Sequence, residues 1–263
     1  MKAIVINLDS AIERMTFQRK QLCSFGIDYI RLPAVLLSTD DLVYKKLSST
    51  WERKLKSEEV ACFLSHKNAW GLVLKSNKPF LIIEDDAYFS KTINCVLKEL
   101  ETLTNIDYIN IEVTGTNKKK LLATKATKEI CESKLFRLYQ GRSGAGGYIL
   151  WPSGARKLLG EFENGKIGLA DKFINNNYSL LSYQLDPAVL IQLDQCVYHS
   201  IKAPLDVDSS ITPKLNSNSI IDKCIKCKFR RFISQVKTGV NHIAHLHHAS
   251  KRKVKISKNL TLK

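Results

Sequence analysis

Residues 80–86 read FLIIEDD, four apolar residues followed by three acids. Four consecutive apolar residues after Pro79 indicate a strand, Phe80 to Ile83, buried on both faces as at the centre of a parallel sheet. Glu84, Asp85 and Asp86 follow at its carboxyl end. Open α/β sheets bind ligands at the carboxyl ends of their strands, so this stretch predicts both a fold class and the position of a site.

The segments around this strand predict alternating strands and helices. Residues 3–8 form a β-rich apolar run, and Ser10 with Glu13 forms a predicted capping box for a helix that ends near Gly26. Residues 36–57 and 117–128 show no clear period and predict polar surface segments. Further predicted strands are 29–32, 108–111 and 135–139; further predicted helices are 57–77, 93–103 and one that begins at Pro152; residues 141–147 are glycine-rich.

The composition is that of a chain that folds in water around an apolar core. A length of 263 residues with 44% hydrophobic content can bury a sizeable core. No stretch reaches the roughly 20 apolar residues that cross a bilayer, and the apolar start is too short for a signal-peptide core. Seven cysteines, an odd number, predict no disulfide framework and a reducing compartment, hence a cytoplasmic protein.

The net charge of +16 is concentrated at the C-terminus. Residues 223–263 hold 12 Lys and Arg and no acid, whereas residues 1–222 hold 29 basic and 25 acidic residues. We therefore expect a catalytic or binding domain at 1–222 and a basic tail at 223–263. A basic tail favours a polyanionic partner, either nucleic acid or an anionic membrane leaflet.

Within that tail, two patterns compete. Cys224, Cys227, His242 and His247 match a zinc-finger spacing. A helical apolar stripe runs through the same interval, where a finger would need a hairpin, and favours a basic amphipathic helix resting on a membrane. The stripe consists of Phe229, Phe232, Ile233, Val236, Val240, Ile243 and Leu246.

Three adjacent acids after a buried strand indicate a divalent cation, because carboxylates held together repel one another unless a cation lies among them. Hard oxygen ligands suit Mn²⁺ or Mg²⁺. An exposed acidic turn is the alternative.

Other polar residues have two interpretations each. Cys62 and His66, four apart on one helical face, could bind a metal or form a nucleophile pair, or could serve packing and hydrogen bonding. Asp171 could be a general base or a helix N-cap. The run from Gly144 to Gly147 allows close approach of a ligand to the backbone or forms a plain turn.

Taken in order, several motifs resemble glycosyltransferase family 25 over roughly the first 200 residues. The motifs are Val5-Ile6-Asn7-Leu8 with Arg14, Ala61-Cys62-Phe63-Leu64-Ser65-His66 followed by Trp70, Leu81-Ile82-Ile83-Glu84-Asp85-Asp86, Ala145-Gly146-Gly147-Tyr148-Ile149-Leu150, Asp171, and Pro187 to Gln192. The resemblance implies a GT-A type α/β fold, with a mostly parallel central sheet flanked by helices. It also implies an inverting transfer of galactose from UDP-galactose to a lipooligosaccharide sugar.

The resemblance also assigns roles to residues. Asp86 is the expected leading metal ligand, with Asp85 on the metal or the ribose and Glu84 the third acid. Asn7, Leu8, Arg14, Ser65 and His66 are expected to bind the donor, with Arg14 on the diphosphate.

On the acceptor side, Gly146, Gly147 and Tyr148 are expected to bind the acceptor sugar, and Asp171 to act as the base. A lipid-linked acceptor would place the enzyme on the cytoplasmic face of the inner membrane, held there by its basic tail. The alternative function is nucleic-acid binding through that tail, with or without zinc.

Overall fold

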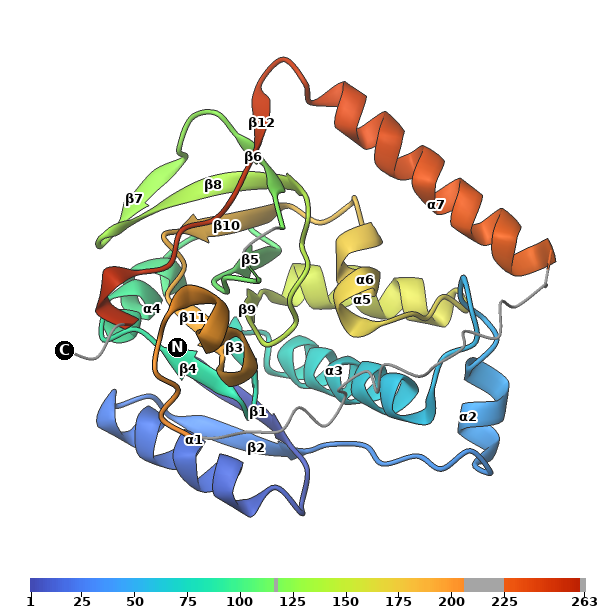
Figure 1. The fold of residues 1–263 in the computed structure, drawn as a ribbon, viewed down its shortest axis with the longest axis horizontal. Helices are drawn as coiled ribbons and strands as arrows, with labels where there is room; N and C mark the ends of the chain where they lie inside the picture. Colours follow the sequence, from blue (N-terminus) through green and yellow to red (C-terminus); the bar gives the residue numbers. More distant parts are fainter. Residues whose placement is uncertain (116–117, 206–224, 261–263) are drawn as a thin grey trace.

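The protein is built on one large mixed sheet with helices on both faces (Figure 1). The computed structural model describes residues 1–115, 118–205 and 225–260. The strand order is β12-β6-β8-β10-β5-β9-β3-β1-β2, with β7 on β8, and β11 pairs separately with β4. The strands are β1 (Lys2–Asn7), β2 (Tyr29–Pro33), β3 (Phe80–Glu84), β4 (Ala87–Phe89), β5 (Tyr108–Asn110), β6 (Lys120–Ala123), β7 (Lys128–Ile130), β8 (Ser133–Gln140), β9 (Gly147–Leu150), β10 (Ser182–Asp186), β11 (Leu190–Gln192) and β12 (Ala249–Arg252).

The strand predicted at residues 80–83 is confirmed as β3, which lies inside the sheet between β1 and β9. Its side chains alternate between the two faces, with Phe80 and Ile82 in one hydrophobic core and Leu81 and Ile83 in the other. Parallel pairing joins β1 to β2 and β3, and β5 to β10. Strand β9 runs antiparallel to β3 and β5, as β6, β7 and β12 do to their partners.

Two layers of helices cover the sheet, which confirms the predicted α/β class. Helices α3, α5 and α6 pack on the face that holds Phe80, while α1 and α4 pack on the opposite face. The helices are α1 (Ile12–Ser24), α2 (Leu42–Leu47), α3 (Ser57–Ser76), α4 (Ile93–Glu101), α5 (Pro152–Glu163), α6 (Ala170–Asn176), α7 (Ile225–Ala244) and the 3-10 helices η1 (Leu193–His199) and η2 (Lys258–Leu260).

Some local predictions need correction. The capping box of Ser10 and Glu13 is not formed, because α1 begins one residue later, after Ala11, which makes no side-chain cap. The segment 36–57 contains the short helix α2, and the segment 117–128 contains β6 and the first residue of β7. Strands β6 and β7 form through pairing with β8 and β12, which a local period does not reveal.

The sequence predicted no disulfide framework, and the described residues contain a single disulfide bond. Cys95 of α4 and Cys131, in the turn between β7 and β8, are joined by a disulfide. An odd number of cysteines argues against a complete set of pairs but not against a single pair. Among the other described cysteines, Cys23, Cys62 and Cys196 carry free thiols.

The predicted helical tail is present as α7, and the chain after it joins the central sheet (Figure 1). Strand β12 pairs antiparallel with β6, and Leu260 packs in a small core with Val113 and Ile191. The proposed boundary between residues 222 and 223, and Cys224, lie outside the described residues. Among the described helices, none combines the length and apolar content that crossing a bilayer requires.

Candidate functional site

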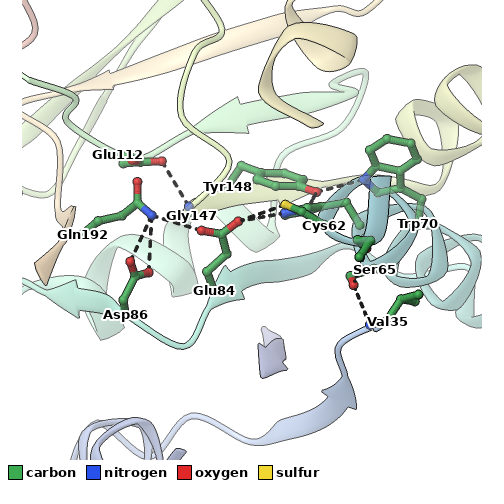
Figure 2. Close-up of polar contacts among 12 residues, drawn as sticks. Val35, Cys62, Ser65, Trp70, Glu84, Asp86, Glu112, Gly147, Tyr148 and Gln192 are labelled. Atoms are coloured by element: carbon green, nitrogen blue, oxygen red, sulfur yellow. Dashed lines mark hydrogen bonds and ion pairs between the residues drawn. The ribbon is translucent and has the colours of Figure 1, made fainter. Parts of the chain in front are cut away.

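The three acids at the carboxyl end of β3 lie in different surroundings, and Gln192 of β11 links Glu84 to Asp86 (Figure 2). Glu84 accepts a hydrogen bond from Gln192 Nε2 on Oε2 (3.0 Å) and lies 3.1 Å from His66 Nε2 through Oε1. The same Gln192 amide reaches both oxygens of Asp86, at 3.2 and 3.4 Å. A carboxylate offers about four lone-pair sites, so Asp86 retains acceptor capacity toward the cleft that it lines.

Asp85 turns toward β1 and α1. Its Oδ2 accepts a hydrogen bond from Asn7 Nδ2 at 2.7 Å, and its Oδ1 lies 3.2 Å from the Arg14 guanidinium. Asn7 in turn accepts a hydrogen bond from Arg31 Nε at 2.8 Å. Asp85 is thus held between an amide and a cation, and Arg14 is positioned by the acid beside which it lies.

Burial makes ionisation of these acids costly. Burial and the neighbouring Glu84 raise the pKa of Asp86 to about 8. Burial also raises the pKa of Asp85, although Asn7 and Arg14 act in the opposite direction. A group of acids in this state is stabilised in its ionised form by a bound cation, which fits a metal site better than the exposed acidic turn considered above.

A first cleft of about 440 Å³ opens over the three acids. Arg14 and the acids lie in its wall together with an apolar segment, residues 34–37, and Leu8. Ser65 fixes that segment, because its Oγ accepts a hydrogen bond from Val35 N at 2.8 Å and donates one to Ala61 O at 2.8 Å. The cleft therefore combines an apolar wall with a charged region.

A second cleft of about 300 Å³ adjoins the first, since both are lined by Cys62, Glu84 and Gln192. Asp171 lines this second cleft from the first turn of α6. The N-cap of α6 is Leu169, so the interpretation of Asp171 as a helix N-cap is wrong. Its carboxylate is available to a molecule bound in this cleft.

His66 and Tyr148 lie behind the site, which corrects their expected contacts with substrates. Both are fully buried, and His66 Nδ1 lies 3.0 Å from the Tyr148 hydroxyl, which accepts a hydrogen bond from Trp70 Nε1 at 2.8 Å. His66 therefore holds Glu84 in place from below. Asn7 is also buried and acts on the site through Asp85.

Cys62 is unsuited to nucleophilic attack. Burial, with Glu84 and Asp171 nearby, raises the pKa of its thiol well above the ordinary value. A thiolate is the nucleophilic form of cysteine, so this environment favours the packing role. Cys62, His66 and Glu84 lie close enough together to be considered as a metal-ligand group, but His66 Nε2 already lies 3.1 Å from Glu84 Oε1.

The glycines before β9 make room for residues of β11. A Cβ on Gly146 would lie 2.5 Å from the side chain of Gln192, and a Cβ on Gly147 would lie 2.2 Å from Leu190 Cδ1. Gly146 lines the second cleft and can still contact an acceptor. Gly147 is fully buried, so its expected contact with an acceptor is corrected to a steric role.

Gly147→Ala is expected to lower the free energy of unfolding by about 1–3 kcal/mol, because the added methyl overpacks the β9–β11 contact. Gly71→Ala in α3 is the matched control, since a Cβ there meets nothing within 4 Å. It is expected to stabilise the protein by roughly 0.5–1 kcal/mol through helix propensity. Urea denaturation followed by circular dichroism measures both, and equal stability of the two variants would contradict the packing argument.

Sequence reasoning missed two residues at the site. Gln192 had no assigned role, although it ends a strand next to the acids. Glu112 is fully buried, accepts a hydrogen bond from Gly147 N at 3.2 Å, and burial raises its pKa to about 8. Neither lies in a charged motif. They reach the site because β11 pairs with β4 and because Glu112, in the loop after β5, pairs with Leu190 of β11.

The zinc-finger alternative for the tail is wrong for the described residues. Cys227 and His242 both lie on the continuous helix α7. A helix rises 1.5 Å per residue, which separates their backbones by about 22 Å. The two residues therefore cannot bind one ion.

A family model and two curated relatives match this chain. The family model described as "Glycosyltransferase family 25 (LPS biosynthesis protein)" matches residues 1–174. A Haemophilus influenzae protein whose name describes a glycosyltransferase is 28% identical over 203 residues, which cover 72% of this chain and 69% of that protein. A protein of Anopheles gambiae named "Glycosyltransferase 25 family member" is 27% identical over 189 residues, which cover 65% of this chain and 30% of that protein.

Several solved structures also resemble the chain, including the following two. A glycosyltransferase involved in the glycosylation of the major capsid of PBCV-1 has a TM-score of 0.38 at 11% identity, covering 73% of this chain and 94% of that one. A Bacillus anthracis protein described as a glucose-1-phosphate thymidylyltransferase has a TM-score of 0.43 at 13% identity, covering 80% of this chain and 98% of that one.

Proposed function

Because this chain belongs to glycosyltransferase family 25, we propose that it transfers galactose from UDP-galactose to a sugar of a lipooligosaccharide, with inversion at the anomeric carbon. The observation that carries this proposal is the pair of adjoining clefts that share Glu84 and Gln192. A donor in one cleft and an acceptor in the other would meet beside the acids at the end of β3.

The first cleft suits a nucleotide diphosphate sugar. Its apolar wall at residues 34–37 can cover a base, and Arg14 in the same wall offers a guanidinium for a diphosphate. Asp85 fixes Arg14 through the 3.2 Å ion pair. Leu8 adds apolar surface at the end of β1, and Ser65 lines the same cleft. Asn7 supports the site from behind through Asp85.

The acids fit Mn²⁺ or Mg²⁺. Both cations prefer carboxylate oxygens and bridge protein carboxylates to phosphates. Asp86 is the proposed main ligand, because its oxygens share one amide hydrogen bond, whereas Asp85 is engaged by Asn7 and Arg14. Glu84 is a secondary candidate because His66 and Gln192 already contact both of its oxygens.

An inverting transfer needs one base for the acceptor hydroxyl and compensation of charge on the leaving diphosphate. Asp171, in the second cleft, is the proposed base that accepts the hydroxyl proton as the oxygen attacks the anomeric carbon. Arg14 offsets negative charge on the departing diphosphate. A bound Mn²⁺ or Mg²⁺ supplies further electrostatic stabilisation of the same charge.

A donor-hydrolysis screen tests this function. UDP-galactose, UDP-glucose and UDP-N-acetylhexosamines are compared in the presence of Mn²⁺, with and without EDTA. We expect UDP-galactose to be hydrolysed fastest and EDTA to stop the reaction until Mn²⁺ is restored. A preference for another donor would change the proposed sugar, and unchanged hydrolysis in EDTA would remove the metal from the proposal.

The lipid part of the acceptor sets the proposed location. A lipooligosaccharide under construction on the cytoplasmic face of the inner membrane is held at an anionic surface. We place the protein there as a peripheral enzyme, with the basic residues after 223 drawn to that surface.

A further inference from the structure

Helix α7 is amphipathic, but its polar face meets the body and its apolar face is exposed. The side chains that face the body are mainly polar, and the apolar stripe faces outward (Figure 1 shows the helix along the edge of the molecule). The exposed apolar residues include Phe229 (63% exposed), Phe232 (60%) and Val240 (62%). A surface helix normally buries that stripe against the core, so this arrangement needs an apolar partner outside the described chain.

The polar face is fixed to the body by specific hydrogen bonds. Arg230 donates to the carbonyls of Ser49 and Trp51. The side chain of Asn241 donates to Tyr139 O at 3.0 Å, and Thr238 Oγ1 lies 3.0 Å from the Tyr178 hydroxyl. The ring of His245 stacks on Tyr139, with their centroids 4.0 Å apart. These contacts set the rotation of the helix, so the outward apolar face is determined by the fold.

Positive charge surrounds the apolar face. Helical spacing places Lys228 on one flank of the stripe and Lys237 on the other, and both side chains are exposed. The described tail, residues 225–260, contains ten Lys and Arg and no acid. Long basic side chains can reach toward phosphates while apolar residues between them enter a less polar layer.

We infer that α7 is a docking surface for an anionic lipid membrane and lies in the plane of the interface with its apolar stripe inserted. A second copy of the chain is a poorer occupant. An isologous contact through α7 would bring the same cations face to face without a compensating acid. Because β12 follows α7 and pairs with β6, the docked helix holds the catalytic part in a fixed orientation.

This inference deepens the proposed function and rests on it for its biological setting, because a lipid-linked acceptor lies at such a surface. Its test uses no sugar. The full-length protein is sedimented with vesicles of phosphatidylethanolamine and phosphatidylglycerol, and with vesicles of phosphatidylcholine alone. We expect binding to the anionic vesicles that weakens as salt is raised, because surface charges are screened.

The decisive variant is Phe229→Ser with Phe232→Ser. We expect the partition coefficient for anionic vesicles to fall by ~10-fold or more, because two aromatic side chains no longer enter the lipid. Lys228→Glu with Lys237→Glu is expected to weaken binding mainly at low salt. Ile12→Ser is the matched control, since Ile12 is 71% exposed on α1, at the opposite end of the molecule from α7 (Figure 1).

Unchanged vesicle binding by the double Phe variant would overturn the inference. So would a dimer in light scattering that dissociates in that variant, because a second copy would then cover the stripe. Thermal denaturation checks that the variants fold. Sugar transfer to a lipid-free acceptor separates the two proposals. If only docking is lost, the double Phe variant should still transfer the sugar. If the proposed function is wrong, the native chain should show no transfer either.

Discussion

Asp86→Ala is expected to abolish metal-dependent transfer, with kcat/KM falling by roughly 1,000-fold or more, because charge on the departing diphosphate is no longer offset at the end of β3. The Gln192 amide loses its contacts with the two Asp86 oxygens, at 3.2 and 3.4 Å. The substitution changes neither hydrophobic core. Initial rates over a range of Mn²⁺ concentrations measure the effect, and circular dichroism should show an intact fold.

Asp28→Asn provides the control for Asp86. Asp28 is an exposed acid before β2, and its known contact is made by its backbone carbonyl, so its loss should leave both the rate and the Mn²⁺ dependence unchanged. Retention of more than a tenth of the rate by Asp86→Ala would contradict the proposed role. The metal would then have to be sought at Glu84 or Asp85.

Asp171→Asn is expected to lower kcat by about 100- to 10,000-fold, the range that general bases contribute, while the affinity for the donor stays unchanged. The amide preserves the size of the side chain in the second cleft but cannot accept the hydroxyl proton. Steady-state kinetics with both substrates, and donor titration by calorimetry, separate the two effects.

Gln195→Ala is the comparison for Asp171, because Gln195 lines the same cleft but offers no base. It is expected to raise the KM for the acceptor with little change in kcat. If Asp171→Asn behaves in the same way, Asp171 orients the acceptor and another group takes the proton.

The part of the site that could be predicted from sequence depends on local patterns. The apolar run Phe80 to Ile83 predicts β3, because a strand that is buried on both faces has no polar position. The acids follow directly in the sequence. The family resemblance then brought Arg14 and Asp171 into the same hypothesis. In the structure, Arg14 lies beside Asp85, and Asp171 lines the second cleft.

What sequence could not supply is the direction of side chains. His66 and Tyr148 belong to two different motifs next to the site, yet their side chains contact each other behind Glu84. Gln192 reaches the acids through the pairing of β11 with β4. For α7 the period predicts a stripe, but it does not tell which face meets the body.

The way in which α7 meets the body also affects local stability. Apart from Cys227, none of its described side chains is fully buried, and a hydrogen bond contributes only about 1 kcal/mol net. The helix can therefore lift away without opening either core, as a local unfolding event of low free energy. Because side chains of β3 and α3 fill the cores, we expect α7 to open at a lower free energy than these elements and to be stabilised by a bound surface.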